Sequence, residues 1–175
     1  FQPKEFWRLS LKINELAKEK GYVKKRYENG SYGSLTRYNG KGQLSTRNAQ
    51  TSHFDQIEKI SANAFNSQFK YRTKACFSCS IPCWPVYIIQ NGKFENYLNE
   101  GVHATTFKEL GARCGISDMD YILVAHAKLN DYGLDTISAP ATIAFAMECF
   151  EKGILSLSDT HGLELDWGRG DVVLE

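Results

Sequence analysis

Three cysteines, Cys76, Cys79 and Cys83, lie within a stretch of eight residues. Thiolates are the usual ligands of iron–sulfur clusters and of many structural zinc ions, and closely spaced cysteines on a turn-rich segment can bind several metal atoms of one cluster. Pro82 restricts the backbone just before the third cysteine. The spacing, two and then three intervening residues, favours an iron–sulfur site and is the reverse of the three-then-two order of radical-SAM enzymes.

Two other interpretations of these cysteines remain open. A zinc site would need four Cys or His ligands, and three buried cysteines could simply act as small hydrophobic residues. The polar Ser78 and Ser80 between the cysteines argue against a plain core. Cys114 and Cys149 are the candidates for a fourth ligand, but both fall on predicted apolar helix faces, where core packing is the simpler role. Five cysteines, three of them clustered, do not form a disulfide framework and fit a reducing, cytoplasmic setting.

The segment from Asn130 to Asp135 joins two predicted helices and is rich in hydrogen-bond acceptors. Gly133 permits the left-handed backbone that commonly ends a helix. Asn130, Asp131 and Asp135 could cap the flanking helices, or they could present acceptors to the N–H groups of a bound heterocycle. Residue type and spacing alone do not choose between these roles.

His103 stands at the start of a predicted helix, two residues after Gly101. An imidazole titrates near neutral pH, so His103 could transfer protons, or it could be a surface residue at a helix start. The other three histidines, His53, His126 and His161, are expected to be structural or solvated.

The elements that must position these residues are mostly helical. Apolar residues at helical spacing, bounded by glycines and capping residues, predict helices over residues 3–20, 55–69, 104–114, 117–133 and 138–152. Asn91-Gly92, between Val86–Ile89 and Lys93–Glu95, predicts a two-residue β-hairpin. The polar, glycine-rich stretch from Gly21 to Gln43 is expected to form loops with short extended pieces. The expected fold class is therefore mainly α, a multihelical domain with a small β-hairpin.

The bulk composition is that of one globular domain. The chain has 175 residues, of which 42% are hydrophobic and 23% charged, and its net charge is +1. This charge balance gives no case for binding nucleic acid or an anionic membrane surface, and no apolar run approaches membrane-spanning length. The chain opens on Phe1 and closes on Asp171–Glu175, which looks like the first turn of a helix. We therefore expect residues 1–175 to be a single domain from a longer chain.

Taken together, these segments resemble the aldehyde ferredoxin oxidoreductase family. The likeness covers nearly the whole chain in a consistent order, which makes it far more specific than the cysteines alone. The matching segments are Thr46–Asn48, Lys74–Cys83, Gly133–Ser138, Ile143–Glu148, Glu151–Gly153 and Leu165–Gly168.

The resemblance implies an enzyme that oxidises aldehydes to carboxylates and passes electrons to ferredoxin. A tungsten or molybdenum ion held by two pterins would be the redox centre, and a 4Fe-4S cluster close to one pterin would carry electrons out. Cys76, Cys79 and Cys83 match three cluster ligands, and the fourth would lie in a later domain, beyond Glu175. This chain would be the middle part of the enzyme, packed against the remaining domains. It would be inactive by itself and bind metal poorly, and a homodimeric parent is left open.

The family's Asp-x-x-Gly-Leu-Asp pterin turn falls on Asn130 to Asp135, so Asn130, Asp131, Gly133, Leu134 and Asp135 are the implied cofactor contacts. Asn130 replaces the usual first Asp but keeps an acceptor oxygen.

His103 departs further from the family, because it stands where many members have the first Glu of Gly-Pro-Glu-x-Glu. A histidine there could still be the catalytic acid–base group. The change suggests a divergent member acting on another carbonyl, or a low-potential reduction as in benzoyl-CoA reductases. A structural zinc-binding module is the alternative from another class.

Overall fold

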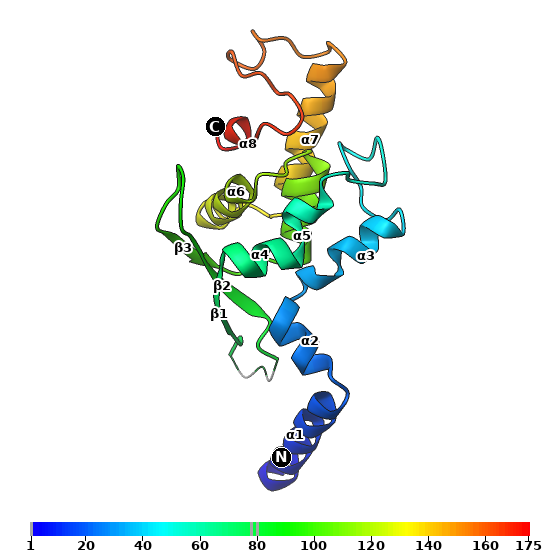
Figure 1. The fold of residues 1–175 in the computed structure, drawn as a ribbon, viewed down its shortest axis with the longest axis vertical. Helices are drawn as coiled ribbons and strands as arrows, with labels where there is room; N and C mark the ends of the chain where they lie inside the picture. Colours follow the sequence, from blue (N-terminus) through cyan, green and yellow to red (C-terminus); the bar gives the residue numbers. More distant parts are fainter. Residues whose placement is uncertain (1, 78, 80) are drawn as a thin grey trace.

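The computed structural model describes residues 2–77, 79 and 81–175, and helices dominate it (Figure 1). A small three-stranded sheet accompanies them, so the expected fold class is confirmed. No helix in the described ranges is long and apolar enough to cross a membrane. In chain order the elements are α1 Pro3–Glu19, α2 Tyr22–Asn29, η1 Tyr32–Ser34, α3 Leu35–Gly40, η2 Ile57–Ile60, α4 Ala62–Gln68, β1 Lys70–Lys74, β2 Trp84–Ile89, β3 Tyr97–Glu100, α5 Ala104–Thr106, η3 Phe107–Arg113, α6 Met119–Asp131, α7 Ser138–Glu151 and α8 Gly170–Val173.

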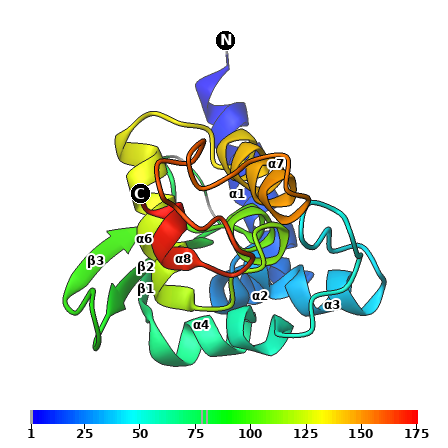
Figure 2. The ribbon, with the colours of Figure 1, turned by 90° about the horizontal axis from the view of Figure 1, so that it is seen from above.

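The sheet is antiparallel with strand order β1-β2-β3. Its central strand β2 is rich in aromatic and β-branched residues, which suit a buried strand. Tyr87 and Ile89 of β2 are buried, and the Tyr87 hydroxyl donates a hydrogen bond of 3.1 Å to the Leu123 carbonyl of α6. Seen from above, α6 lies between the sheet and α7, with α8 beside it (Figure 2).

The predicted hairpin exists, but its turn and second strand were placed wrongly. The second strand begins at Tyr97, and the Asn96 N–H closes a longer connection by donating to the Ile89 carbonyl at 2.8 Å. Lys93–Glu95 form part of that connection because Phe94 packs edge-on against Tyr121 of α6, with ring centroids 5.2 Å apart. A packing contact with a helix therefore overrides the Asn-Gly turn signal. The strand β1 was not predicted.

The stretch from Gly21 to Gln43 is also corrected, because it is mainly helical rather than loop. Tyr32 and Leu35 are fully buried and anchor these short helices to the core. Close packing against Tyr32 requires a glycine at position 30, because a Cβ there would lie 2.3 Å from a ring carbon of Tyr32. A glycine that looked like a loop signal thus permits close contact with a buried ring.

The remaining helices appear close to their predicted positions. The 55–69 segment divides into η2 and α4, with the Ser61 hydroxyl capping α4. The 104–114 segment begins as α5 and continues as the π-helical η3. Asp118 caps α6, and the hydroxyl of the preceding Ser117 donates to the Gln56 side chain at 2.9 Å.

Four aromatic side chains from separate elements form the centre of the core. Phe65 of α4 meets Tyr32 of η1, Tyr87 of β2 and Phe107 of η3 edge-on, with centroid separations of 4.9 to 6.0 Å. Edge-to-face contacts at these distances are the favourable arrangement for aromatic rings. This cluster links the sheet to helices that precede it and to one that follows it in the chain.

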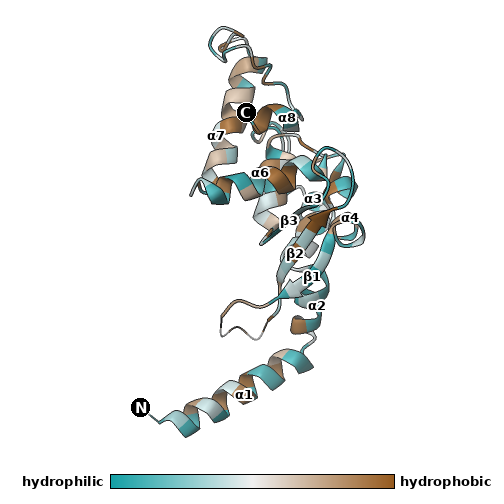
Figure 3. Cartoon of the chain, turned by 90° about the vertical axis from the view of Figure 1, so that its left-hand side faces the viewer, coloured by the Kyte–Doolittle hydropathy of each residue, from teal (hydrophilic) through white to brown (hydrophobic). Residues whose placement is uncertain are grey.

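Helix α1 is confirmed, but its predicted inner face is not buried. It projects away from the rest of the chain (Figure 1), and apolar residues recur along it (Figure 3). Phe6 is 60% and Ile13 64% exposed, and α1 contains no buried residue. The described residues therefore leave this apolar face uncovered.

Candidate functional site

Cys76, Cys79 and Cys83 lie on the connection between β1 and β2. The last strand pair before this connection is Lys74 with Trp84, which brings the ends of the cysteine segment together. The Cys79 N–H donates to the Cys76 carbonyl at 3.0 Å in a turn. The segment is therefore a strand connection, as the turn-rich sequence indicated.

The three cysteines have free thiols, and none of them is buried. Cys76 and Cys79 are exposed, Cys83 is half-buried, and none of them forms a disulfide. Ser78 and Ser80 lie outside the described residues. Within the described ranges, no three His, Cys, Asp or Glu side chains come together as a metal site. A donor set made only of thiols fits the soft-ligand preference of iron–sulfur clusters and zinc.

The two remaining cysteines behave differently. Cys114 is fully buried, and its Sγ donates to the Glu109 carbonyl at 3.4 Å and the Pro140 carbonyl at 3.5 Å. Burial raises the pKa of the Cys114 thiol to about 12, so it stays protonated. Cys149 is half-buried on α7. Cys114 is therefore a core thiol, as its predicted helix face indicated.

Trp84 connects the cysteine segment to His103. It follows Cys83 directly, and its indole packs edge-on against the imidazole of His103, with centroids 5.2 Å apart. The indole Nε1 is buried and has no hydrogen-bond partner among the described residues. It is a buried donor for which the described part of the chain supplies no acceptor.

His103 is the N-cap of α5 and is half-buried. Its Nδ1 lies 3.2 Å from the Ser31 hydroxyl, which also accepts from the Ala104 N–H at 3.1 Å. Burial, and then the positive charge of Arg26, lower the pKa of His103 below its usual value. The imidazole is therefore neutral at pH 7 and able to accept a proton.

A chain of polar contacts runs from His103 to the predicted pterin turn. The backbone N–H of His103 donates to Thr106 Oγ1 at 3.2 Å. This oxygen lies 3.3 Å from His126 Nδ1. His126 Nε2 lies 3.1 Å from Asn130 Nδ2. Thr106 is 1% and His126 4% exposed.

Sequence reasoning missed the part that His126 plays in this chain. Its one signal is a histidine inside the apolar run 122–127 and four residues before Asn130, a spacing that places both side chains on one helix face.

In the Asn130–Asp135 turn, the carboxylate of Asp135 is held in place by hydrogen bonds. Asp135 Oδ2 accepts from the Ser138 N–H at 2.6 Å, the Ser138 hydroxyl at 2.7 Å and the Ile137 N–H at 3.2 Å. These hydrogen bonds, those from Ser138 first, hold the pKa of Asp135 below its usual value. Gly133 adopts φ +67°. Asp135 therefore caps the start of α7, whereas Asp131 and Leu134 are exposed.

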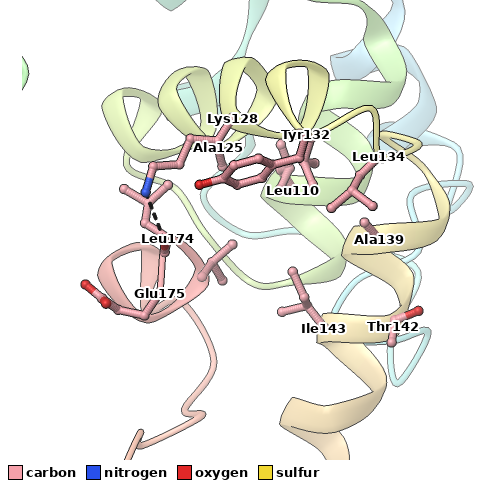
Figure 4. Close-up of a pocket in the computed structure, with 12 residues that line it drawn as sticks. Leu110, Ala125, Lys128, Tyr132, Leu134, Ala139, Thr142, Ile143, Leu174 and Glu175 are labelled. Atoms are coloured by element: carbon pink, nitrogen blue, oxygen red, sulfur yellow. Dashed lines mark hydrogen bonds between the residues drawn. The ribbon is translucent and has the colours of Figure 1, made fainter.

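An apolar cavity of about 470 Å³ lies behind the turn, between α6, α7 and α8 (Figure 4). Tyr132 and Leu134 of the turn line it, together with Ile143 of α7. Lys128 Nζ donates to the Leu174 carbonyl at 3.0 Å across one side. The turn thus has an apolar side facing this cavity.

The Thr46–Asn48 segment joins two parts of this region. The Arg47 and Asn48 N–H groups donate to the carbonyls of Ala112 and Arg113 at 3.1 and 3.0 Å. Asn48 Nδ2 also donates to Glu148 Oε2 of α7 at 2.7 Å. The segment therefore links the end of η3 to α7, which follows the turn.

Comparison with known proteins finds one matching family and several relatives of this chain. The family model for "aldehyde ferredoxin oxidoreductase, domains 2 & 3" matches residues 8–175. The tungsten-containing aldehyde ferredoxin oxidoreductase of Pyrococcus abyssi is 37% identical over 125 residues, which are 71% of this chain and 20% of that protein. That of Thermococcus kodakarensis is 34% identical over 138 residues, which are 77% and 22%. The chain thus spans about a fifth of the length of these relatives.

A solved structure shares the fold. The active-site complex BamBC of benzoyl coenzyme A reductase, in complex with 1,5-dienoyl-CoA, contains a chain that superimposes with a TM-score of 0.57 at 24% identity. The match covers 87% of this chain and 27% of that one. At this identity the likeness supports the fold alone.

Proposed function

Because this chain belongs to the aldehyde ferredoxin oxidoreductase family, we propose that it is the cluster- and pterin-binding middle part of a tungsten- or molybdenum-containing oxidoreductase. The parent enzyme oxidises an aldehyde to a carboxylate and delivers the electrons to ferredoxin. Residues 1–175 act as one domain within it and pack against the remaining domains.

The observation that carries this proposal is the contiguity of the three predicted site regions. Trp84, next to Cys83, packs on His103, and the contacts through Thr106 and His126 lead to Asn130. These regions are far apart in sequence. A structural zinc-binding module would need only the cysteines and would not require the other two regions to lie beside them. The arrangement supports an electron path and a proton-handling group close to one cofactor.

The cysteines have the first role. Cys76, Cys79 and Cys83 would ligate three irons of a 4Fe-4S cluster, and a ligand from elsewhere in the parent chain would complete it. When bound, the cluster supplies one-electron transfer, and the tungsten or molybdenum bis-pterin supplies two-electron redox chemistry. The exposed position of Cys76 and Cys79 suits a cluster enclosed between this domain and the next.

The turn has the second role, which is to orient the pterin. Asn130, Asp131 and Asp135 offer acceptor oxygens to the N–H groups of the heterocycle, while Gly133 and Leu134 shape the turn. With Oδ2 of Asp135 committed to α7, its Oδ1 is the oxygen left for a ligand.

His103 has the third role. Aldehyde oxidation follows the balance RCHO + H₂O → RCOO⁻ + 3H⁺ + 2e⁻, so water must lose protons as the new C–O bond forms. The neutral imidazole of His103 can accept one of these protons. The electrons pass singly to two oxidised ferredoxins.

Metal analysis of the full parent protein, purified without oxygen, tests the proposal. We expect about four irons per chain, tungsten or molybdenum, and a reducible cluster signal in electron paramagnetic resonance. Cys76→Ser and Cys83→Ser should lose most of the iron. Cys149→Ser is the matched control, because it removes a half-buried cysteine outside the segment and should keep the iron.

Two results would contradict the proposal. Zinc without iron would identify a structural zinc module. Iron and tungsten without aldehyde oxidation would indicate a divergent member that acts on another carbonyl or, like benzoyl-CoA reductases, catalyses a low-potential reduction.

A further inference from the structure

The imidazole of His126 is buried and has a polar neighbour at each of its two nitrogens. On one side, Nδ1 lies 3.3 Å from Thr106 Oγ1, and on the other Nε2 lies 3.1 Å from Asn130 Nδ2. Burial lowers the pKa of the ring, and a backbone interaction with Glu100 opposes this effect. The surrounding α6 residues Ile122, Leu123, Ala125 and Ala127 are apolar and buried. A buried imidazole with defined partners on both sides has a defined tautomer.

The partners determine that tautomer. The amide Nδ2 of Asn130 can only donate, so the facing Nε2 of His126 must accept. A neutral imidazole carries a single N–H, so the other nitrogen, Nδ1, carries the hydrogen. Thr106 Oγ1 can accept from Nδ1 as well as from the His103 N–H. Burial, and second the nearby titratable imidazole of His103, lower the pKa of His126 to about 4, so the ring is neutral at pH 7.

The same contacts determine which way the Asn130 amide points. Asn130 Nδ2 donates to His126 Nε2 at 3.1 Å and to the His126 carbonyl at 3.0 Å, which uses both of its hydrogens. The reverse orientation would place Oδ1 against two acceptors and is disfavoured. Oδ1 therefore points away from His126 and has no hydrogen-bond partner among the described residues. Asn130 is itself exposed, so this oxygen is accessible to a ligand.

We propose that His126 is a positioning residue that holds the Asn130 amide with its oxygen outward, so that the turn presents an acceptor to an N–H group of the bound pterin. This role rests on the proposed function of the turn. A carboxylate at position 130 would face the His126 carbonyl and the bare Nε2, and would require an added proton on the ring. The Asn at this position and the neutral His126 are thus complementary.

Two substitutions of similar size separate positioning from simple packing. In His126→Gln, the longer amide can place its oxygen where Nε2 lies and accept from Asn130. In His126→Asn, the shorter amide can donate toward Thr106 but does not reach Asn130. Both variants keep a polar amide in the same buried place, so they should have similar unfolding midpoints.

The test is made on the full parent protein, by following the rate of pterin loss in dilute urea. His126→Gln should match the wild type, and His126→Asn should lose pterin about 2–10-fold faster, the effect of one hydrogen bond. Equal rates for the two variants would overturn the proposal.

A second measurement is independent of the cofactor. The spectrum of protein labelled with ¹⁵N-histidine should show His126, identified by its loss in both variants, as the neutral Nδ1–H tautomer. An Nε2–H tautomer would overturn the inference. A wild-type protein without pterin would refute the proposed function instead, and the tautomer would still decide the orientation of Asn130.

Discussion

At the scale of single residues, Asp135 divides its two oxygens between structure and a prospective ligand. Oδ2 takes three hydrogen bonds from Ile137 and Ser138, whereas Oδ1 takes none within the described part of the chain. Capping and cofactor contact, which looked like alternatives in the sequence, are compatible. One substitution should therefore affect stability as well as cofactor binding.

Replacing Asp135 with alanine should lower the thermal unfolding midpoint at pH 7. The native-state hydrogen bonds lower the pKa of this carboxyl, so its stabilising effect is present above the unfolded-state pKa of about 3.9 and is lost as pH falls through the native value. The difference between wild type and Asp135→Ala should thus be large at pH 7 and 5 and shrink toward pH 3. Thermal unfolding followed by circular dichroism at these pH values measures it.

Asp131→Ala is the matched control for this experiment. Asp131 lies in the same turn region, is exposed, and accepts no side-chain hydrogen bond within the described ranges. Its substitution should leave the midpoint nearly unchanged. Equal losses in the two variants, or a difference that grows in acid, would refute the capping role of Asp135.

At the scale of elements, the register of β1 and β2 decides where the cysteines lie. Lys74 pairs with Trp84, and the neighbouring Pro85 carbonyl accepts from the Gly101 N–H at 2.9 Å. This places Gly101 under the Trp84 indole, beside His103. The cysteine connection is thus supported by the sheet and by one close backbone approach.

Gly101→Ala should destabilise the protein for two reasons. Gly101 has φ +91°, and a Cβ there would lie 2.6 Å from an indole carbon of Trp84. A positive φ costs a non-glycine residue about 1–2 kcal/mol, and the clash adds to it. Gly153→Ala is the control, because its φ is +69° and no atom lies within 4 Å of the added Cβ. Urea unfolding should show a larger loss for Gly101→Ala, and equal losses would contradict the packing argument.

At the scale of the whole molecule, α1 is a helix with no buried residue. Its six exposed large apolar residues are Phe6, Trp7, Leu9, Leu11, Ile13 and Leu16. An apolar stripe of this kind contributes little to folding while it remains in water. The stability of the chain should therefore reside in the part from α2 onward.

Deleting residues 2–20 should shift the unfolding midpoint of the chain by less than about 3 °C, because α1 has no buried residue to lose. Phe65→Ala is the comparison, since Phe65 is fully buried and its loss should cost about 3–5 kcal/mol. Differential scanning calorimetry of both variants measures the shifts. A drop on deletion as large as that of Phe65→Ala would show that α1 belongs to the core.

The sequence by itself determined the features that depend on local pattern. Helices α1, α6 and α7 follow from apolar periodicity and caps, and the cysteine segment and the Asn130–Asp135 turn were recognisable from residue type and spacing. The ligand role of the cysteines, the pterin contacts and the catalytic role of His103 stay predictions. What local pattern can show is which residues could do chemistry and where helices start and stop.

Only the tertiary structure decided the rest, because the deciding contacts join residues far apart in the chain. The 21–43 helices depend on burying Tyr32 and Leu35, and the second hairpin strand was displaced by the contact of Phe94 with Tyr121. His126 acquired its place in the site through Thr106, twenty residues away. Burial of this kind is a property of the packed molecule, and no local window of sequence contains it.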